Sequence, residues 1–315
     1  MEDSTPQCSF QIRNKALEGY LKNTNEKMDT VILPEGIKEI GNHAMKEFEC
    51  TRLVMPRSLK AIRYEAFAFA RIKEIDFNHC NLADIDHRAF FGCTAQTVLP
   101  NSLRCLGDEA IRHLDLIKGQ KLRLPSSLSY IGYHAMFLGG LRVLEVDERL
   151  VTNSSGLEDL IMTTEDHSAH WLFLNVRRDG NLVCRVPFPR ESGYSKGNFI
   201  DENGFNGDAF DDWFLRANDR YIKAAIAAFR VMFPKNLTWT KDYRNYALYN
   251  FSFLLDSFEE DVETIKLYTE AGLITAYRLR KLLERARAKR NVELVAAIME
   301  LLDFKCGYSA KILRL

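Results

Sequence analysis

The chain has 315 residues, and its 43 basic and 43 acidic side chains give a formal net charge of zero. A balanced charge creates no global field that would draw the chain to nucleic acid or to an anionic membrane surface. The hydrophobic fraction of 46% is sufficient for buried cores and argues against a disordered chain. This length predicts about two domains.

The start of the chain and its cysteines favour a cytoplasmic protein. Met1 to Asn14 carries charges and has no apolar segment of the secretory kind, and no apolar run approaches a membrane span. The seven cysteines are odd in number and scattered, which is typical of reduced, buried thiols. We therefore expect a cytoplasmic location, with export to the cell surface left open.

Residues 9–21 fit two local structures. Leu17, Tyr20 and Leu21 fit a helix, whereas Phe10 and Ile12 alternate as in a strand. Asn14 and the residue after it can form a tight turn, because asparagine tolerates the left-handed conformation. We favour a hairpin, and we expect residues 1–27 to cap the repeats that follow.

A repeat of 21 to 25 residues follows, anchored on a small residue. The anchors are Ala44, Ala66, Ala89, Ala110 and Ala135. A branched aliphatic residue lies four positions before each anchor and another lies three before that: Ile40 and Ile37, Ile62 and Leu59, Ile85 and Leu82, Leu106 and Leu103, Ile131 and Leu128. A large apolar residue follows each anchor: Met45, Phe67, Phe90, Ile111 and Met136. Four copies also have a proline: Pro34, Pro56, Pro100 and Pro125.

Each copy begins with a short alternating run, which predicts a strand. The inward residues are Val31 and Leu33, Leu53 and Met55, Ile75 and Phe77, Thr97 and Leu99, Leu122 and Leu124. The rest of a copy is too short for a helix with its loops, so it must turn back and stack on its neighbour. Leu144 and Val146 begin a sixth copy that does not continue. We predict a β-rich solenoid over residues 28–147.

The motif Leu-Pro-x-x-Ile-x-x-Ile-Gly-x-x-Ala-Met, repeated as Ile-Arg-x-x-Ala-Phe and Leu-Gly-x-x-Ala-Ile, resembles the BspA-like leucine-rich repeat of bacterial proteins. The resemblance implies an α/β leucine-rich-repeat solenoid with short strands. Arg63 and Asp86 depart from it in the glycine slot, and the third copy lacks the proline. These departures affect local regularity and leave the fold unchanged.

Residues 148–208 separate the repeats from a second domain. Residues 148–170 are polar and lose the repeat. Residues 171–176 and 182–188 flank Asp179-Gly180 and predict a β-hairpin, which we expect to cap the far end of the solenoid. Residues 190–208 are rich in glycine and predict a loop.

Residues 209–315 follow a helical period and predict an all-α domain of helical hairpins. Phe210, Trp213 and Phe214 share a face, and a second stripe from Ile222 to Met232 ends at Pro234. Further helices are predicted at 241–256, 260–271, 276–289 and 292–303, with Gly272 after a helix end and Thr275 as an N-cap. Asp261-Val-Glu-Thr-Ile and Asn291-Val-Glu-Leu-Val lie thirty residues apart and leave an ankyrin-like array open. This half also resembles the helical segment that follows such repeats in bacterial proteins, which implies no activity.

The sequence has no Walker loop and no Gly-x-Ser-x-Gly or His-Glu-x-x-His motif, so we expect no enzyme and no cofactor. His167 and His170 have metal-ligand spacing but lie in a polar stretch typical of a solvated loop. His79-Cys80, His87 and Cys93 fall in slots of the repeat. The acidic loop 201–208 lacks the ligand and the glycine that an EF-hand requires. We therefore predict no metal site.

The outward side chains of the predicted strands form two columns. One column is Ile32, Val54, Asp76, Val98, Arg123 and Glu145, and the other is Thr30, Arg52, Glu74, Gln96, Lys121 and Val143. Three exposed β-branched residues, Ile32, Val54 and Val98, then lie near a negative patch at Glu74 and Asp76 and a positive patch at Lys121 and Arg123. Protein interfaces use this layout, although a solvated sheet also exposes β-branched residues. We predict protein binding by the residues of these columns up to Lys121 and Arg123.

A second candidate is the basic helix over residues 276–290. Its cations are Arg278, Arg280, Lys281, Arg285, Arg287, Lys289 and Arg290, and its apolar face is Leu279, Leu282, Leu283 and Ala286. Such a face is usually solvated, and the alternative is a patch that binds an acidic protein or nucleic acid. We see no interleaved aromatic residues for base stacking, which disfavours nucleic acid.

Three functions stay open at this point. The leading hypothesis is a non-enzymatic protein-binding scaffold, because a solenoid presents an extended sheet. The second is a surface adhesin like secreted members of the BspA-like family, which the missing export signal disfavours. The third is a regulatory module that binds through the basic helix. Neither the partner nor the oligomeric state follows from the sequence.

Overall fold

The computed structural model describes residues 8–23, 28–116, 121–153, 155–162, 171–189, 199–201, 204–234, 240–256 and 261–306. The chain divides into two compact units. The solenoid unit comprises Met1–Leu174 and Phe188–Phe205, and the helical unit comprises Asn175–Pro187 and Asn206–Leu315.

The chain begins with the hairpin that residues 9–21 predict. Strands β1 (Cys8–Arg13) and β2 (Ala16–Lys22) pair antiparallel, and Asn14 and Lys15 connect them with φ of 49° and 68°. Two positive φ values suit the twist of a two-residue hairpin turn. β2 then pairs parallel with β4 (Glu39–Ile40), which belongs to the first repeat. The hairpin therefore provides the first layer of the stack.

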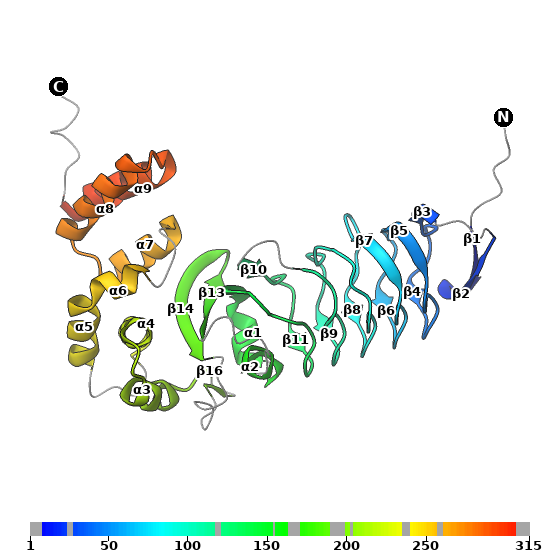
Figure 1. Ribbon diagram of the computed structural model, residues 1–315, viewed down its shortest axis with the longest axis horizontal. Helices are drawn as coiled ribbons and strands as arrows, with labels where there is room; N and C mark the ends of the chain where they lie inside the picture. The colour runs from blue at the N-terminus through cyan, green and yellow to red at the C-terminus, as the bar shows by residue number, and fades with distance from the viewer. Residues whose placement is uncertain are drawn as a thin grey trace. The chain divides into compact units, whose positions relative to one another are not determined.

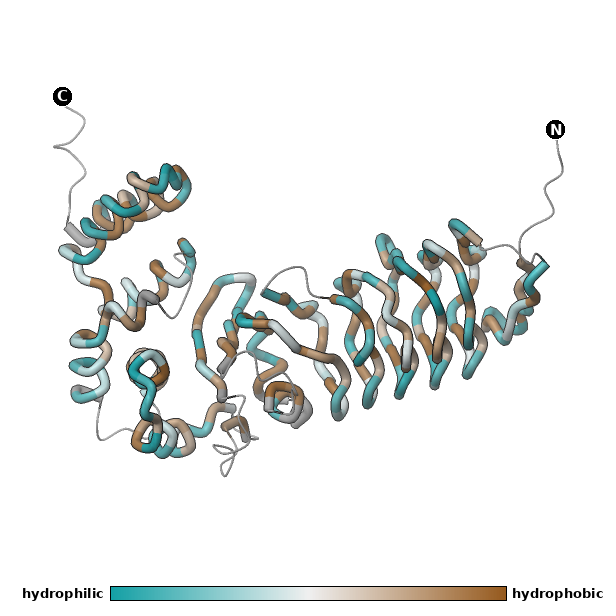
Figure 2. Tube along the Cα trace, in the orientation of Figure 1, coloured by the Kyte–Doolittle hydropathy of each residue, from teal (hydrophilic) through white to brown (hydrophobic). Residues whose placement is uncertain are grey.

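Each regular copy contributes two strands to two parallel ladders (Figure 1). The longer strands form the three-stranded sheet β3 (Met28–Ile32), β5 (Glu49–Val54) and β7 (Arg71–Asp76). The second ladder continues from β4 through β6 (Ala61–Ile62), β8 (Asp84–Ile85), β9 (Cys105–Leu106) and β11 (Tyr130–Ile131). Figure 2 shows apolar and polar positions interleaved along each coil.

The core of the solenoid confirms the register of the repeat. All five anchor alanines are buried, as are the aliphatic and large apolar residues on either side of them. The residue before each anchor has a positive φ, between 47° and 58°, so every coil turns there through the left-handed region. Coils also approach closely at the glycine slot, because a Cβ added to Gly132 would lie 2.5 Å from the backbone nitrogen of Asp108.

The strand ladder is interrupted where the sequence predicts its fourth strand. Thr97 and Leu99 are buried as expected, but only isolated bridges form at this level, from Glu74 to Gln96 and from Gln96 to Asp115. Asp115, not Lys121, therefore continues the column of Gln96. β10 (Lys121–Arg123) instead pairs with β12 (Val143–Asp147). The prediction of two unbroken columns was wrong because extra residues after Asp115 shift the fifth copy.

The segment after β12 is helical, which its polar composition did not predict. Helices α1 (Glu148–Asn153) and α2 (Ser155–Met162) bury the apolar side chains of Leu150, Val151, Leu157, Leu160 and Ile161. The glycine-rich stretch expected to be loop also contains the short pair β15 (Ile200–Asp201) and β16 (Gly204–Phe205). The Glu158 carboxylate fixes this segment by accepting the backbone N–H groups of Phe199 and Ile200 at 2.6 and 3.2 Å.

The predicted hairpin forms from β13 (Trp171–Arg178) and β14 (Asn181–Pro189), with Asp179 and Gly180 both at positive φ. The sheet runs in the order β10-β12-β13-β14. The backbone N–H of Phe173 donates to the carbonyl of Arg142 at 2.8 Å. The base of the hairpin thus continues the strand layer of the solenoid unit, and its tip, Asn175–Pro187, belongs to the helical unit.

The helical unit contains α3 (Gly207–Arg216), α4 (Arg220–Met232), α5 (Thr240–Tyr249), α6 (Phe251–Asp256), α7 (Val262–Glu270), α8 (Ala276–Ala288) and α9 (Val292–Cys306). Thr275 is the N-cap of α8, and Gly272, at φ 71°, follows the end of α7, both as predicted. The single helix expected over 241–256 is two helices, broken at Asn250. Within the described ranges, no helix combines the length and the apolarity needed to cross a bilayer.

Candidate functional site

The outward strand face, as we name it, consists of the outward side chains of β3, β5 and β7. Two rows cross these strands: Thr30, Arg52 and Glu74 lie opposite one another, and so do Ile32, Val54 and Asp76. Ile32 is 68% exposed and Val54 is half-buried, while the adjacent Val31, Leu53 and Ile75 are buried. The structure therefore brings seven of the ten predicted binding residues onto one sheet or its bridged edge, counting Gln96.

The strands begin earlier than the alternating pattern predicts. Met28, Cys50 and Ile72 are buried three residues before Val31, Leu53 and Ile75, so two successive residues face outward between them. Lys73 and Glu74 are such a pair, and both are exposed. The recurring apolar residue at this three-residue spacing was the signal that strict alternation missed.

Charges on this face pair with one another. The Arg52 guanidinium lies 2.5 Å from the Asp76 carboxylate and 3.7 Å from that of Glu74. Partial burial raises the pKa of Asp76, but the N–H of Asn78 and the Arg52 guanidinium outweigh it and hold that pKa below its usual range. The negative patch predicted at Glu74 and Asp76 is thus partly neutralised, because one guanidinium is shared between two carboxylates.

The positive patch also differs from the prediction. Lys121 lies 2.8 Å from the Glu145 carboxylate, and Glu145 is only 2% exposed. Glu145 lies on β12, an interior strand that is paired on both sides, by β10 and by β13. Val98 is exposed, but it lies outside any strand, and no described pairing links it to Asp76. The apolar centre of the face is therefore the neighbouring pair Ile32 and Val54.

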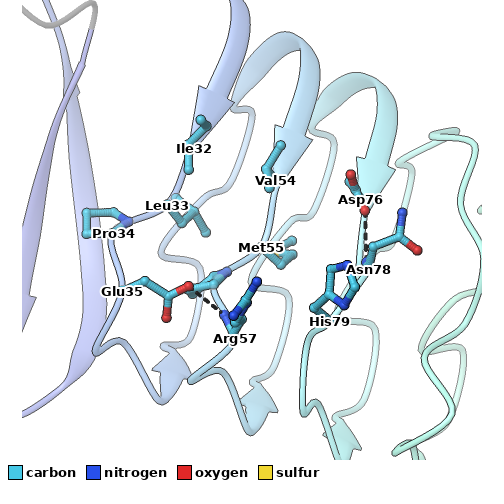
Figure 3. Close-up of a pocket in the computed structure, with 11 residues that line it drawn as sticks. Ile32, Leu33, Pro34, Glu35, Val54, Met55, Arg57, Asp76, Asn78 and His79 are labelled. Carbon is cyan, nitrogen blue, oxygen red and sulfur yellow. Dashed lines mark hydrogen bonds between the residues drawn. The ribbon is translucent and has the colours of Figure 1, made fainter.

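A groove of about 450 Å³ opens where β3, β5 and β7 end (Figure 3). Its residues are Ile32, Leu33, Pro34, Glu35, Val54, Met55, Pro56, Arg57, Asp76, Asn78 and His79. The Glu35 carboxylate accepts the backbone N–H of Arg57 at 3.0 Å, and Asp76 accepts that of Asn78 at 2.8 Å. These bonds fix the turns after the strands, while the exposed Arg57 guanidinium forms no ion pair within the described part of the chain. The groove joins an apolar wall to a rim of mixed charge, where Arg57 lies next to Glu35.

Residues 15–141 match the family model of the BspA type leucine-rich repeat region, in six copies. This part of the chain is a BspA-type leucine-rich repeat region. The match begins at the turn of the N-terminal hairpin, which agrees with the pairing of β2 and β4. No curated protein matches the chain. Repeats of this family are commonly protein-binding or surface-associated, and they are generally non-catalytic scaffolds.

The basic helix is α8, which lies in the helical unit and not in the BspA-type region. Leu279, Leu282 and Ala286 are buried, as predicted. Arg278 does not belong to the exposed patch, because its guanidinium donates to the carbonyls of Leu273 and Leu248 and lies 4.1 Å from the Phe251 ring centre. Burial lowers the pKa of Arg278.

The exposed cations of α8 are Arg280, Lys281, Arg285 and Arg287, together with Lys289 and Arg290 just beyond its end. Lys281 lies 4.8 Å from the ring of Tyr277, an exposed aromatic residue that the sequence interpretation overlooked. One aromatic side chain is not a series of stacking platforms, so the patch suits an acidic partner better than single-stranded nucleic acid.

The candidate metal ligands of the BspA-type region do not converge. Cys80 and Cys93 are buried, and burial raises the pKa of each thiol to about 11, whereas His79 is exposed and His87 is half-buried. Among the described residues, no group of three or more His, Cys, Asp or Glu side chains is placed to hold a metal ion. His167 and His170 lie outside the described residues, as does part of the loop 201–208.

Proposed function

We propose that this protein is a non-enzymatic scaffold that binds a protein partner on the outward strand face of its BspA-type region. The observation that carries the proposal is the pair Ile32 and Val54, which lie side by side and open into the groove at the strand ends. Burying an exposed aliphatic side chain contributes about 1.5–3 kcal/mol, so two adjacent ones can anchor an interface. The groove adds Arg57 as a cationic rim contact.

Strand pairing supports recognition by side chains. β5 is paired on both sides, by β3 and by β7, so its backbone groups are already hydrogen-bonded. A partner on this face must therefore contact projecting side chains and not add a strand at β5. Charged rim residues such as Arg52 then tune orientation and association rate more than affinity.

The test is partner capture with a tagged full-length chain, quantified by mass spectrometry. Ile32→Glu combined with Val54→Glu places two charges in the apolar centre and should abolish capture while leaving the thermal midpoint unchanged. The matched control, Val292→Glu with Met299→Glu, alters two exposed apolar residues of the helical unit and should capture normally.

Two outcomes contradict the proposal. If capture survives the double change on the strand face and is lost in Arg285→Glu with Arg287→Glu, the partner is bound by α8. If the captured partner is found only outside cells or on a cell surface, the adhesin alternative replaces the scaffold.

A further inference from the structure

The helical unit contains a cavity of about 220 Å³ that the proposed function does not use. It lies between α3 and α5 and is lined by Asp211, Phe214, Leu215, Asp242, Tyr243 and Tyr246. Pockets for drug-sized ligands occupy about 300–1,000 Å³. The cavity is thus of a size for one side chain or one small organic ion.

Three aromatic side chains line it, and the Phe214 ring lies at near right angles to each of the other two. The centroids of Phe214 and Tyr243 are 4.9 Å apart at an interplanar angle of 77°, and those of Phe214 and Tyr246 are 5.1 Å apart at 82°. Aromatic faces carry the negative part of the ring quadrupole, so a ring face that opens onto the cavity attracts a cation. Lys223 already uses this property, since its ammonium lies 5.2 Å from the Phe214 centroid without lining the cavity.

Asp211 fixes one wall and is already neutralised. Its carboxylate accepts the guanidinium of the fully buried Arg230 at 2.7 and 3.1 Å, and the Tyr243 hydroxyl donates to it at 2.8 Å. Burial, together with this hydrogen bond, raises the pKa of Tyr243 well above its usual range, so the phenol stays neutral and its ring is held in place.

Asp242 supplies the free charge. It lies on α5, it is exposed, and no cation pairs with it among the side chains that the structure describes. An apolar aromatic cavity with a single available carboxylate favours a cation that is easily stripped of water, and a methylated ammonium fits this better than the strongly hydrated ammonium of lysine. We propose that this cavity binds a quaternary or methylated ammonium group.

The first test compares choline with its neutral isostere, 3,3-dimethylbutan-1-ol, by NMR titration of the full chain. The two molecules have the same shape and differ in charge. Choline should bind saturably and at least tenfold more tightly, with shifts confined to α3 and α5. Equal binding of the two would show an ordinary apolar cavity and would overturn the proposal, as would binding of neither choline nor a trimethyllysine peptide.

Variants localise the charge and the rings. Asp242→Asn and Tyr246→Leu should each lower the affinity for choline at least fivefold. Lys223→Gln removes a competing cation and should raise that affinity. The control Tyr249→Leu alters a residue on the same helix that is 90% exposed and outside the cavity, and should change nothing. Unchanged affinity in Asp242→Asn, a surface change that keeps the fold, contradicts the proposal even if Tyr246→Leu is unstable.

The same titration shows whether the ammonium group belongs to a modified protein or to a free small cation. A trimethyllysine peptide that binds at least tenfold more tightly than choline assigns the cavity to a modified protein. Comparable affinities assign it to a free small cation. Because the strand face is untouched by these variants, partner capture through Ile32 and Val54 distinguishes failure of this inference from failure of the proposed function.

Discussion

Among the residues that the structure describes, the solenoid unit buries the polar side chains of Thr97 and Glu145, whereas the helical unit buries three arginines. Successive coils of the solenoid are joined by the same backbone bond, from Met45 to Ala66, Phe67 to Ala89 and onward at 2.8–2.9 Å. In the helical unit, Arg177 instead joins the hairpin tip to Glu263 on α7, at 2.8 Å for one of its two contacts. Arg230 likewise joins α4 to Asp211 on α3.

The difference concerns how stability is distributed. In a repeat, each coil contacts only its neighbours, and stability is close to a sum of similar apolar terms. A buried arginine concentrates several hydrogen bonds at one point, and removing it leaves its partners unsatisfied. We therefore expect single polar substitutions to be costly in the helical unit, and single volume changes to be costly in the solenoid.

The largest effect is expected at Arg230. Arg230→Met removes a fully buried guanidinium that serves Asp211 and the carbonyl of Phe233, and should lower the free energy of unfolding by about 3 kcal/mol. The control Arg216→Met breaks a pair with Asp212 in which both side chains are more than half exposed, and should cost under about 1 kcal/mol. Urea denaturation measures the free energy of unfolding of both variants. Similar losses in the two would show that the buried arginine stabilises no more than an exposed one.

An intermediate effect is expected at Ala89, in the middle of the solenoid. Ala89→Leu places three extra carbons where the N–H of Phe67 bonds the carbonyl of Ala89 at 2.8 Å, and should cost about 1–3 kcal/mol by overpacking. Ala288→Leu, on the exposed side of α8, should be near neutral. A neutral result at Ala89 by thermal unfolding would show that the coils have room to separate at this slot.

A smaller effect is expected at Asp76. Its lowered pKa means that its contribution to stability is present above the unfolded pKa of about 3.9 and is lost as the pH falls through the lower folded value. Asp76→Asn keeps an acceptor for the Asn78 N–H but loses the pair with Arg52, which is 45% exposed, so we expect less than about 1 kcal/mol near pH 7. The difference between the two proteins should shrink as the pH falls below about 3.9 and through the lower folded pKa, and a difference that does not change with pH would assign the effect to packing.

The repeat was predictable because the same slots recur. Five anchor alanines fix the register, and Asn14 and Asp179-Gly180 are local turn signals that need no knowledge of neighbours. The departures depend on contacts distant in sequence. Asp115 displaces Lys121 from the column of Gln96 only once the coils are stacked, and the burial of Glu145 accompanies the pairing of β12 with β13 in the folded chain.

The helical unit shows the same limit. Helix ends at Thr275 and Gly272 follow from local capping chemistry, whereas the inward turn of Arg278 depends on the carbonyl of Leu248, thirty residues away. The aromatic cavity is likewise assembled from two helices, by Phe214 on α3 and by Tyr243 and Tyr246 on α5. The polar-looking segment 148–162 hides its helices because its apolar residues are spread among charged ones.

The smallest effect on stability is expected from the protonation state of the thiols of the solenoid. The same thiols also report how the solenoid opens. Burial raises the pKa of Cys8 and of Cys93, the latter to about 11, so both are protonated at pH 8 and react slowly with a thiol reagent. Because the folded pKa of Cys93 is raised, its contribution to stability is complete below the unfolded pKa of about 8.5 and is lost as the pH rises through about 11. A thermal unfolding scan at pH 7 should therefore give the same midpoint with and without reductant.

The order of labelling then tests the one-dimensional character of the solenoid. Cys8 lies in the terminal hairpin and Cys93 lies three coils inward, and a stack of coils opens from its ends. At pH 8, with sub-denaturing urea, Cys8 should react at least tenfold faster than Cys93, as followed by mass spectrometry of the labelled peptides. Cys50, between them, should react at an intermediate rate. Equal rates for all three would mean that the solenoid opens in one cooperative step, and its stability would then not be a sum over separate coils.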